Sequence, residues 1–472
     1  LPVEIGKLVN LQDLFVSENY LAAIPAAIAD LTGLQDLRLQ YNNLGSLTRE
    51  MVHLASLTHL NVSFNKLIEL PEELAGMTSL KSLEFDSNQI HKLPSGMGKL
   101  VQLTDMTLVG NKVTELPSEM GELTQLRSIR CDVENFTSPP PEIFAQGAEI
   151  LIEYLSRLEM GRESNRLMLN DFALQSFPSA ILNMETLETL NLDGNNLKTV
   201  PEGFTRLQNL TEISLHGNPF VTLPPEIGTL SHLQYLSYDR TVLRNPPAEI
   251  LDRGLEVIVN FLRRIYDSRA NGTINLAGMG MENLVAAEVW TGQIVTPSIT
   301  KLNFKNNNLT TWPSFMCELV STNVTKLSLA TNAIASLPVT MGGLIGLVTV
   351  NLSSNHLKAL PASFADLTKL TKVKLNNNEF NIVPSCVFEL PKLKVLEAYG
   401  NEFTALPSVI SNMSVLTHLN LSNNALRTLP PEIGALSSLT ELKLAHNDLD
   451  SIPSEVGGMQ SLILLHVNHN RL

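Results

Sequence analysis

The chain has 472 residues, 33 lysines and arginines against 47 aspartates and glutamates, and a formal net charge of -14. Nucleic acid and anionic lipid repel such an acidic chain, so we expect neither class of partner and no membrane insertion. No segment holds the roughly 20 consecutive apolar residues that a helix needs to span a bilayer. Cys131, Cys317 and Cys386 cannot all pair and match no zinc-binding spacing, which favours buried, reduced thiols and a cytoplasmic location.

In chain order, the first feature is a repeat of 23 residues that is marked by one asparagine. Around the marker lies L-x-x-L-x-L-x-x-N-x-L, followed by x-x-L-P-x-x-I-x-x-L, as in residues 416–436. The alternating L-x-L predicts a short strand with leucines on one face, and the L-P step followed by I-x-x-L predicts a short helical turn. The markers are Asn19, Asn42, Asn65, Asn88, Asn111, Asn195, Asn218, Asn307, Asn332, Asn355, Asn378, Asn401, Asn424, Asn447 and Asn470.

These repeats predict an α/β fold of the leucine-rich-repeat type, a horseshoe-shaped solenoid. Successive strands form a parallel concave sheet, and short helices or turns lie on the convex side. No single repeat can bury its leucines alone, so neighbouring repeats share one interior. The marker asparagine has both a donor and an acceptor, and we expect it to satisfy buried backbone groups in a row beneath the strands.

The asparagine register fails twice, and the two interruptions copy each other at an offset of 107 residues. The first begins with P-P-P-E-I at 139–143 and the second with P-P-A-E-I at 246–250. Apolar residues at helical spacing follow each motif, which predicts one longer convex helix near 141–159 and another near 248–266. The predicted organisation is therefore repeats at 1–138, 166–245 and 273–472, separated by helical interruptions at 139–165 and 246–272.

We expect the stack of strands to continue through both interruptions with a local change of twist, the alternative being a break into three arcs. Phe172 and Met279 stand in the asparagine position after each interruption and should fill it with bulk. Residues 282–298, which include Trp290 and Pro297, form a small insertion to which we assign no element. The sequence opens and closes within a repeat, so we expect it to be part of a longer protein.

The L-P-x-x-I-G-x-L repeat, as at 223–228 and 429–434, resembles that of intracellular Ras-group leucine-rich-repeat proteins, which include Shoc-like scaffolds. The interruptions resemble helical segments of Roco-type proteins and of leucine-rich repeat-containing protein forty. No G-x-x-x-x-G-K-[ST] motif follows either interruption, so the GTPase domain of the Roco family does not carry over. The resemblance implies a scaffold that holds protein partners on its concave face, with a small GTPase as one such partner.

No H-E-x-x-H, paired C-x-x-C or G-x-S-x-G motif occurs, so we expect no enzymatic activity, no cofactor and no metal site. His418, His446, His466 and His469 gather near one end of the inner face, where a solvated polar surface is favoured over a metal or pH-sensing cluster. Two alternatives remain beside the scaffold. The repeats could target a larger signalling enzyme, such as a GTPase, kinase, phosphatase or cyclase, or belong to a structural assembly.

The residues between the leucines of each strand should face the concave side and contact a partner. Early repeats place mainly acidic residues there and later repeats mainly lysines, an arrangement that would orient a partner of complementary charge. Tyrosine and arginine are frequent hot spots, whereas an ordinary solvated face is the competing interpretation. The predicted partner-binding residues are Asp13, Phe15, Asp36, Arg38, Tyr41, Asp86, Tyr235, Lys326, Lys372, Lys374, Tyr399, His418 and His446.

Overall fold

The computed structural model describes residues 1–284, 298–319 and 323–472. Most of the insertion predicted at 282–298, including Trp290 and Pro297, lies outside these ranges. The described chain divides into a first unit, Leu1–Phe220 with Leu230–Val242, and a second unit, Val221–Thr229 with Leu243–Leu472. Within the described ranges, no helix combines the length and the apolar character that crossing a membrane requires.

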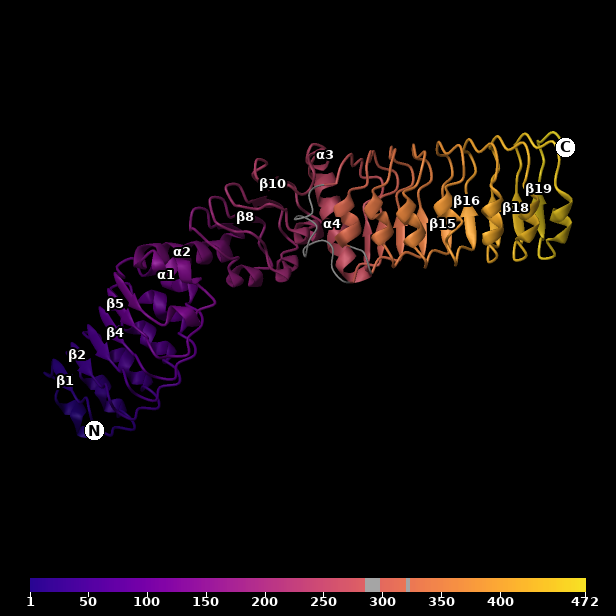
Figure 1. Ribbon diagram of the computed structural model, residues 1–472. Coiled ribbons are helices and arrows are strands. Elements are labelled where there is room, and N and C mark those ends of the chain that lie inside the picture. The colour runs from indigo at the N-terminus through magenta and orange to yellow at the C-terminus, as the bar shows by residue number, and fades with distance from the viewer. Residues whose placement is uncertain (285–297, 320–322) are drawn as a thin grey trace. The chain divides into compact units, whose positions relative to one another are not determined.

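Each repeat contributes one three-residue strand that pairs in parallel with the strand of the next repeat (Figure 1), which confirms the predicted parallel sheet. The first unit holds a six-stranded sheet, β1 (Asp13–Phe15), β2 (Asp36–Arg38), β3 (His59–Asn61), β4 (Ser82–Glu84), β5 (Asp105–Thr107) and β6 (Ser128–Arg130). It also holds a four-stranded sheet, β7 (Arg166–Met168), β8 (Thr189–Asn191), β9 (Glu212–Ser214) and β10 (Tyr235–Ser237). The second unit holds a nine-stranded sheet, β11 (Thr273–Asn275), β12 (Lys301–Asn303), β13 (Lys326–Ser328), β14 (Thr349–Asn351), β15 (Lys372–Lys374), β16 (Val395–Glu397), β17 (His418–Asn420), β18 (Glu441–Lys443) and β19 (Leu464–His466).

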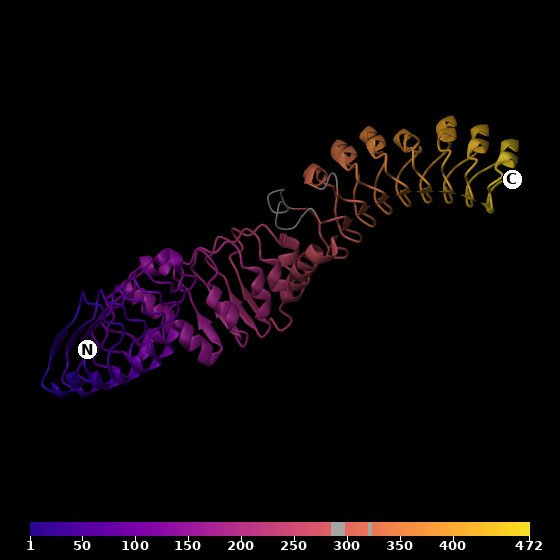
Figure 2. The same cartoon turned by 90° about the horizontal axis from the view of Figure 1, so that it is seen from below.

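Short 3-10 helices follow the Leu-Pro steps of the repeats. In the second unit, Figure 2 shows these helices on the outer side of an arc whose inner side carries the strands. Proline usually precedes the helix, as Pro71 does in an extended conformation with φ -66° and ψ 143°, rather than occupying its first position. The 3-10 helices are η1 (Val3–Lys7), η2 (Ala26–Asp30), η3 (Arg49–His53), η4 (Glu72–Gly76), η5 (Ser95–Lys99), η6 (Ser118–Glu122), η7 (Val133–Asn135), η8 (Ser179–Asn183), η9 (Glu202–Arg206), η10 (Pro225–Thr229), η11 (Val339–Gly343), η12 (Ala362–Asp366), η13 (Ser385–Val387), η14 (Ser408–Asn412), η15 (Pro431–Ala435) and η16 (Ser454–Gly458).

The leucines at strand centres and the marker asparagines form the interior, as predicted. Leu37 and Leu83 are fully buried, and Asn65 is 8% exposed. The Asn65 Nδ2 group donates to the Leu39 carbonyl of the preceding repeat and to the Val62 carbonyl of its own repeat, each at 3.0 Å. These bonds satisfy backbone groups that the leucine interior would otherwise leave unpaired.

Each interruption forms two helices rather than the single helix that we predicted. The breaks lie at Gly147 and Gly254, whose φ angles of 99° and 86° are readily adopted by glycine alone. The longer helix of each pair ends at residue 164 or 271, five residues beyond the predicted end at 159 or 266. The helices are α1 (Pro141–Ala145), α2 (Ala148–Ser164), α3 (Ala248–Leu251) and α4 (Leu255–Asn271), and a further short helix is α6 (Ser314–Leu319).

Phe172 and Met279 fill the asparagine position as predicted, and they are 5% and 2% exposed. A side chain from each helical segment donates a hydrogen bond to the backbone carbonyl of the residue in the asparagine position. Gln146 Nε2 donates to the Phe172 carbonyl at 2.9 Å, and Arg253 Nη1 donates to the Met279 carbonyl at 2.6 Å. The donors and the acceptors of these two hydrogen bonds are each 107 residues apart, so the two interruptions also match in this contact.

The strands do not form one continuous ladder, so the expected continuity of the stack is wrong at the level of the sheet. One period after β6, the chain at 151–153 lies within α2, where no strand can form. The first sheet consequently ends at β6 and the next begins at β7. In the first unit α2 packs against both η6 and β7, and its Leu151, Leu155 and Leu158 are buried.

Candidate partner-binding surface

The paired strands of the first unit place the predicted binding residues in two straight columns. Asp13 lies opposite Asp36, and Phe15 lies opposite Arg38, one strand apart. Paired strands lie about 4.8 Å from each other, so side chains in one column touch. The central residue of each strand points into the leucine interior, which leaves the two flanking side chains on the open face of the sheet.

Arg38 links the two columns at the start of the sheet. Its guanidinium lies 4.7 Å from the ring centroid of Phe15, and its Nη2 donates to Asp36 Oδ2 at 2.9 Å. The hydrogen bond to Asp36, together with the carboxylate charge, raises the pKa of Arg38 above its ordinary value. Phe15 remains 57% exposed, so the stacked arginine and ring present a charged, apolar surface to solvent.

Tyr41 and Phe64 form a second exposed feature, directly after β2 and β3. Their rings stack with centroids 4.3 Å apart and an interplanar angle of 10°. Each residue precedes a marker asparagine and has a left-handed backbone, with φ of 57° and 54°. This conformation recurs before most markers and forms a further row of side chains beside the strands. We call Phe15, Arg38, Tyr41 and Phe64 the aromatic cluster.

Tyr41 is among the binding residues predicted from the sequence, but the stacking of its ring on Phe64 was not foreseen. The available signal was an aromatic residue immediately before a marker asparagine in consecutive repeats. Sequence reasoning also missed Tyr20, which is 92% exposed directly after the marker Asn19.

Asp86, another predicted binding residue, is half-buried and holds neighbouring repeats together. Its Oδ1 accepts a hydrogen bond from the backbone amide of Val109 at 2.7 Å. Its own backbone amide donates to Ser63 Oγ at 3.1 Å. The Asp86 carboxylate therefore joins neighbouring repeats, whereas the Asp13 carboxylate is exposed to solvent.

The two remaining tyrosines among the predicted binding residues lie in different units. In the first unit Tyr235 lies on β10 opposite Glu212 of β9, with 57% of its surface exposed. In the second unit Tyr399 is half-buried, and its carbonyl accepts a hydrogen bond from the Asn377 amide at 2.8 Å. Only Tyr235 therefore presents most of its side chain to solvent.

The predicted lysines lie on the nine-stranded sheet of the second unit. Lys326 is exposed and lies opposite Lys301 in register, so two positive charges occupy neighbouring strands. Lys372 and Lys374 flank the centre of β15 and are half-buried. Lys374 lies 3.8 Å from Glu397 Oε1, so part of its charge is already compensated.

Histidines gather at the end of the same sheet. The rings of His446 and His469 stack with centroids 4.2 Å apart, and His418 Nε2 lies 3.5 Å from Glu441 Oε1. The hydrogen bond from Lys443 is the main cause that lowers the pKa of Glu441. Among the described residues, no three histidine, cysteine, aspartate or glutamate side chains gather in a geometry that could hold a metal ion.

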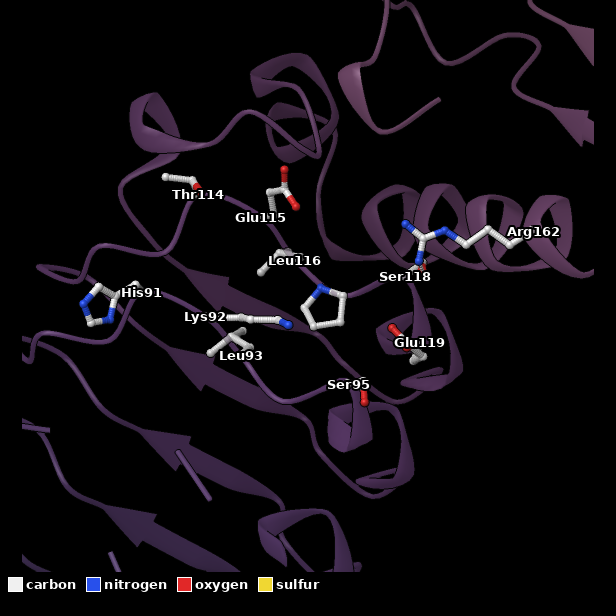
Figure 3. Close-up of a pocket in the computed structure, with 11 residues that line it drawn as sticks. His91, Lys92, Leu93, Ser95, Thr114, Glu115, Leu116, Ser118, Glu119 and Arg162 are labelled. Atoms are coloured by element: carbon white, nitrogen blue, oxygen red, sulfur yellow. Dashed lines mark hydrogen bonds between the residues drawn. The ribbon is translucent and has the colours of Figure 1, made fainter. Parts of the chain in front are cut away.

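A cavity of about 380 Å³ lies on the flank of the first unit, between repeat loops and α2 (Figure 3). Ser118 lies at its wall and is almost fully buried. The Ser118 hydroxyl donates to Glu159 Oε2 at 2.6 Å and accepts from Arg162 Nη1 at 2.8 Å. These bonds fasten α2 to η6, so we assign the polar wall of this cavity to the fold.

Two family models match the chain. One, described as a leucine-rich repeat region, matches residues 31–160. The other, described as leucine rich repeat, matches residues 165–220, 322–380, 391–449 and 414–472. The matched segments reach into all three sheets. No curated protein sequence matches the chain.

Several solved structures are similar to the chain over nearly all of its length. A leucine-rich-repeat protein of Leptospira interrogans is 25% identical with a TM-score of 0.35, covering 100% of this chain and 93% of its own. The Arabidopsis receptor kinase HAESA, in complex with the peptide hormone IDA and the co-receptor SERK1, is 21% identical with a TM-score of 0.34, covering 100% and 72%. An internalin of Listeria monocytogenes is 16% identical with a TM-score of 0.25, covering 97% and 88%.

Proposed function

This chain is a leucine-rich-repeat protein, and on that premise we propose that it is a non-catalytic scaffold that binds a partner protein on the open face of its sheets. The aromatic cluster of the first unit is the observation that carries the proposal. Tyr41 and Phe64 are 51% and 44% exposed although they are large and apolar. Aromatic and arginine side chains contribute much of the binding energy at protein interfaces, which makes this cluster the strongest anchor on the sheet.

The backbone of Tyr41 and Phe64 supports a binding role over a folding role. A left-handed conformation costs a residue other than glycine about 1–2 kcal/mol, and bulky side chains rarely adopt it. Other repeats place residues that tolerate it at the same position, such as Gly110 and Asn377. The repeat requires this backbone conformation but no bulky residue in it, so the aromatic side chains at 41 and 64 favour a function for them.

Charge around the aromatic cluster favours a basic partner. Exposed Asp13 adjoins it on β1, and half-buried Glu84 follows two strands further along the column of Arg38, whereas Asp36 is already paired with Arg38. An acidic surface around a hydrophobic anchor attracts and orients a positively charged patch. The resemblance to Ras-group repeat proteins makes a small GTPase the first partner class to test.

We propose a cytoplasmic location, which the free thiols of the chain support. Cys131, Cys317 and Cys386 are all free, with Cys131 half-buried rather than buried as expected. Burial raises the pKa of Cys131 and of Cys386 to about 11, so neither thiol is activated for exchange. Reduced, unreactive thiols suit a compartment that keeps cysteines reduced.

Quantitative affinity capture from native cells tests the scaffold proposal. The test variant combines Phe15→Ser, Arg38→Ala, Tyr41→Asn and Phe64→Asn, which removes the aromatic cluster without deleting a leucine. The matched control combines Ile68→Ser and Val101→Ser, two exposed apolar residues of the same unit that lie outside its strands. We expect partners to be lost only from the test variant, and equal recovery with both variants would contradict the proposal.

The lysines of the second unit are tested by a separate variant. Lys326→Glu, Lys372→Glu and Lys374→Glu together reverse the charge on two strands of the nine-stranded sheet. We expect this variant to lose partners that bind the basic sheet and to keep those that bind the aromatic cluster. Unchanged capture of every partner would show that the second unit has no part in binding.

A further inference from the structure

The open edge of β6 is a second candidate surface, distinct from the face that carries the aromatic cluster. β6 pairs with β5 on one side only, because the next strand along the chain, β7, belongs to a separate sheet. Unpaired strand edges can accept a strand from another chain, and proteins usually cover or charge them for that reason.

The backbone groups along this edge can be identified by comparison with β5. The Thr104 carbonyl accepts hydrogen bonds from the amides of Arg127 and Ser128 at 2.8 and 3.1 Å, and the Leu108 amide donates to the Arg130 carbonyl at 2.8 Å. The equivalent groups one repeat later are the Arg127 carbonyl and the Cys131 amide. Within the described ranges of the chain neither has a hydrogen-bond partner. One acceptor and one donor are thus available on the same edge.

A groove borders these groups. A cavity of about 510 Å³ lies against β6 and the start of α2, and a second of about 860 Å³ adjoins it along the helix. Arg127, Gly147 and Ala148 line both cavities. The first has apolar walls from half-buried side chains, namely Ile129, Cys131, Val133 and Phe144.

The charge is positive at the β6 end of the groove, whereas Glu149 and Glu153 line the adjoining cavity along α2. Arg127 and Arg130 are both exposed and both line the cavity at β6. The ion pairs found among the described residues include neither of them, whereas Arg157 of α2 is paired with Glu153 at 3.0 Å. Two uncompensated guanidinium groups beside an open strand edge favour a ligand that carries carboxylates.

We propose that the edge of β6 binds an extended, acidic segment of a partner protein as an added strand. The segment pairs its backbone with the Arg127 carbonyl and the Cys131 amide, as in other cases of strand addition. An apolar side chain of the segment lies in the groove against Ile129 and Phe144. An acidic side chain next to it lies against Arg127 or Arg130, which selects acidic partners here although the chain as a whole is acidic.

The test uses the full chain and a fluorescent synthetic peptide of alternating valine and threonine with aspartate at both ends. The control peptide has the same sequence with every second amide N-methylated, which removes backbone donors and leaves the side chains unchanged. Fluorescence anisotropy measures affinity, and hydrogen exchange followed by NMR measures protection of the Cys131 amide. We expect the first peptide to bind with a Kd below about 1 mM, to slow exchange at Cys131, and to bind far more tightly than the control.

Two protein variants localise the binding. Arg127→Glu with Arg130→Glu is expected to weaken binding by about tenfold or more. Lys99→Glu with Arg206→Glu makes the same charge change at exposed positions on 3-10 helices of the same unit and is expected to leave affinity unchanged.

Three results would overturn the proposal. The first is absence of saturable binding. The second is that the N-methylated peptide binds as tightly as the unmodified one, or that the unmodified peptide binds both charge variants equally tightly. The third is concentration-dependent dimerisation that Arg127→Glu and Arg130→Glu abolish, which would assign the edge to a second copy of this chain.

Discussion

The side-chain oxygen of Asn65 accepts a hydrogen bond from the backbone amide of Leu44, one repeat earlier, at 3.0 Å. The same side chain donates to the carbonyls of Leu39 and Val62. In Asn65→Ala the Leu39 and Val62 carbonyls keep hydrogen bonds from Asn42 and Asn88, but the Leu44 amide loses its partner. An unsatisfied buried group costs about 1–3 kcal/mol, so we predict that the free energy of unfolding falls by that amount, measured by urea denaturation followed by circular dichroism.

Asn19 provides the matched control for this substitution. It is exposed and donates only to the nearby carbonyls of Val16 and Ser17. Asn19→Ala should cost less than about 1 kcal/mol, as substitutions at exposed sites usually do. Equal losses for the two variants would show that the marker asparagine does not join one repeat to the next.

Gly121 marks the place where α2 packs on η6, and a larger residue should not fit there. A Cβ atom at this position would lie 2.3 Å from the Ser156 nitrogen in the helix backbone. We predict that Gly121→Ala displaces α2 and lowers the free energy of unfolding by about 1–3 kcal/mol. Gly45→Ala is the control, because a Cβ atom there would meet nothing within 4 Å. Equal stability of the two variants in urea denaturation would refute the close packing.

The equivalent residue of the second interruption, Gly228, shows why such positions are hard to predict. Its Cβ atom would lie 2.1 Å from the Arg263 nitrogen of α4. The repeat consensus already contains glycine at this position, as in Gly434, so nothing in the local sequence distinguishes it. Glycine is required in ordinary repeats as well, because a Cβ atom at Gly434 would lie 2.4 Å from the Glu455 carbonyl of the next 3-10 helix. At Gly121 and Gly228 the crowding neighbour is instead a helix of an interruption, which the local sequence does not reveal.

Tyr41→Asn should separate stability from binding. Asparagine tolerates the left-handed backbone, which recovers about 1 kcal/mol of strain, while loss of the stack on Phe64 costs about 0.5–1.5 kcal/mol. These terms oppose each other, so the free energy of unfolding should change by less than about 1 kcal/mol. We predict that partner capture nevertheless falls severalfold. A variant that unfolds easily and still captures its partners would argue that Tyr41 serves the fold.

Glu379 provides a prediction about pH. His356 Nδ1 lies 2.8 Å from Glu379 Oε1, and this hydrogen bond is the main cause that lowers the pKa of Glu379 below its ordinary 4.5. A carboxyl group with a depressed pKa stabilises the fold at pH values above its unfolded pKa, and the contribution is lost as the pH falls through the folded pKa. We predict an NMR titration midpoint below 4.5 for Glu379, and a higher midpoint in His356→Ala. An unchanged midpoint in that variant would exclude the hydrogen bond as the cause.

The sequence was sufficient to predict the strand register, the leucine interior and the asparagine row, because each depends on a pattern that one repeat shares with the next. Residues Asp13, Phe15, Asp36, Arg38 and Tyr41 could be assigned to one face for the same reason. The breaks at Gly147 and Gly254 were missed, because apolar spacing continues across them and only the backbone conformation reveals the kink. The open edge of β6 was missed because the sequence pattern continues into β7 and does not show that β7 starts a separate sheet.

Site-specific photo-crosslinking tests the central claim, that a partner binds the open face of the first sheet. A benzoylphenylalanine replaces Phe64 in one protein and Ile68 in another, two residues of the same repeat that are 44% and 54% exposed. Each protein is irradiated with the partner recovered by affinity capture, and the crosslinked product is quantified by mass spectrometry. Our account predicts crosslinking from position 64 and little from position 68. Efficient crosslinking from position 68 with none from position 64 would contradict it.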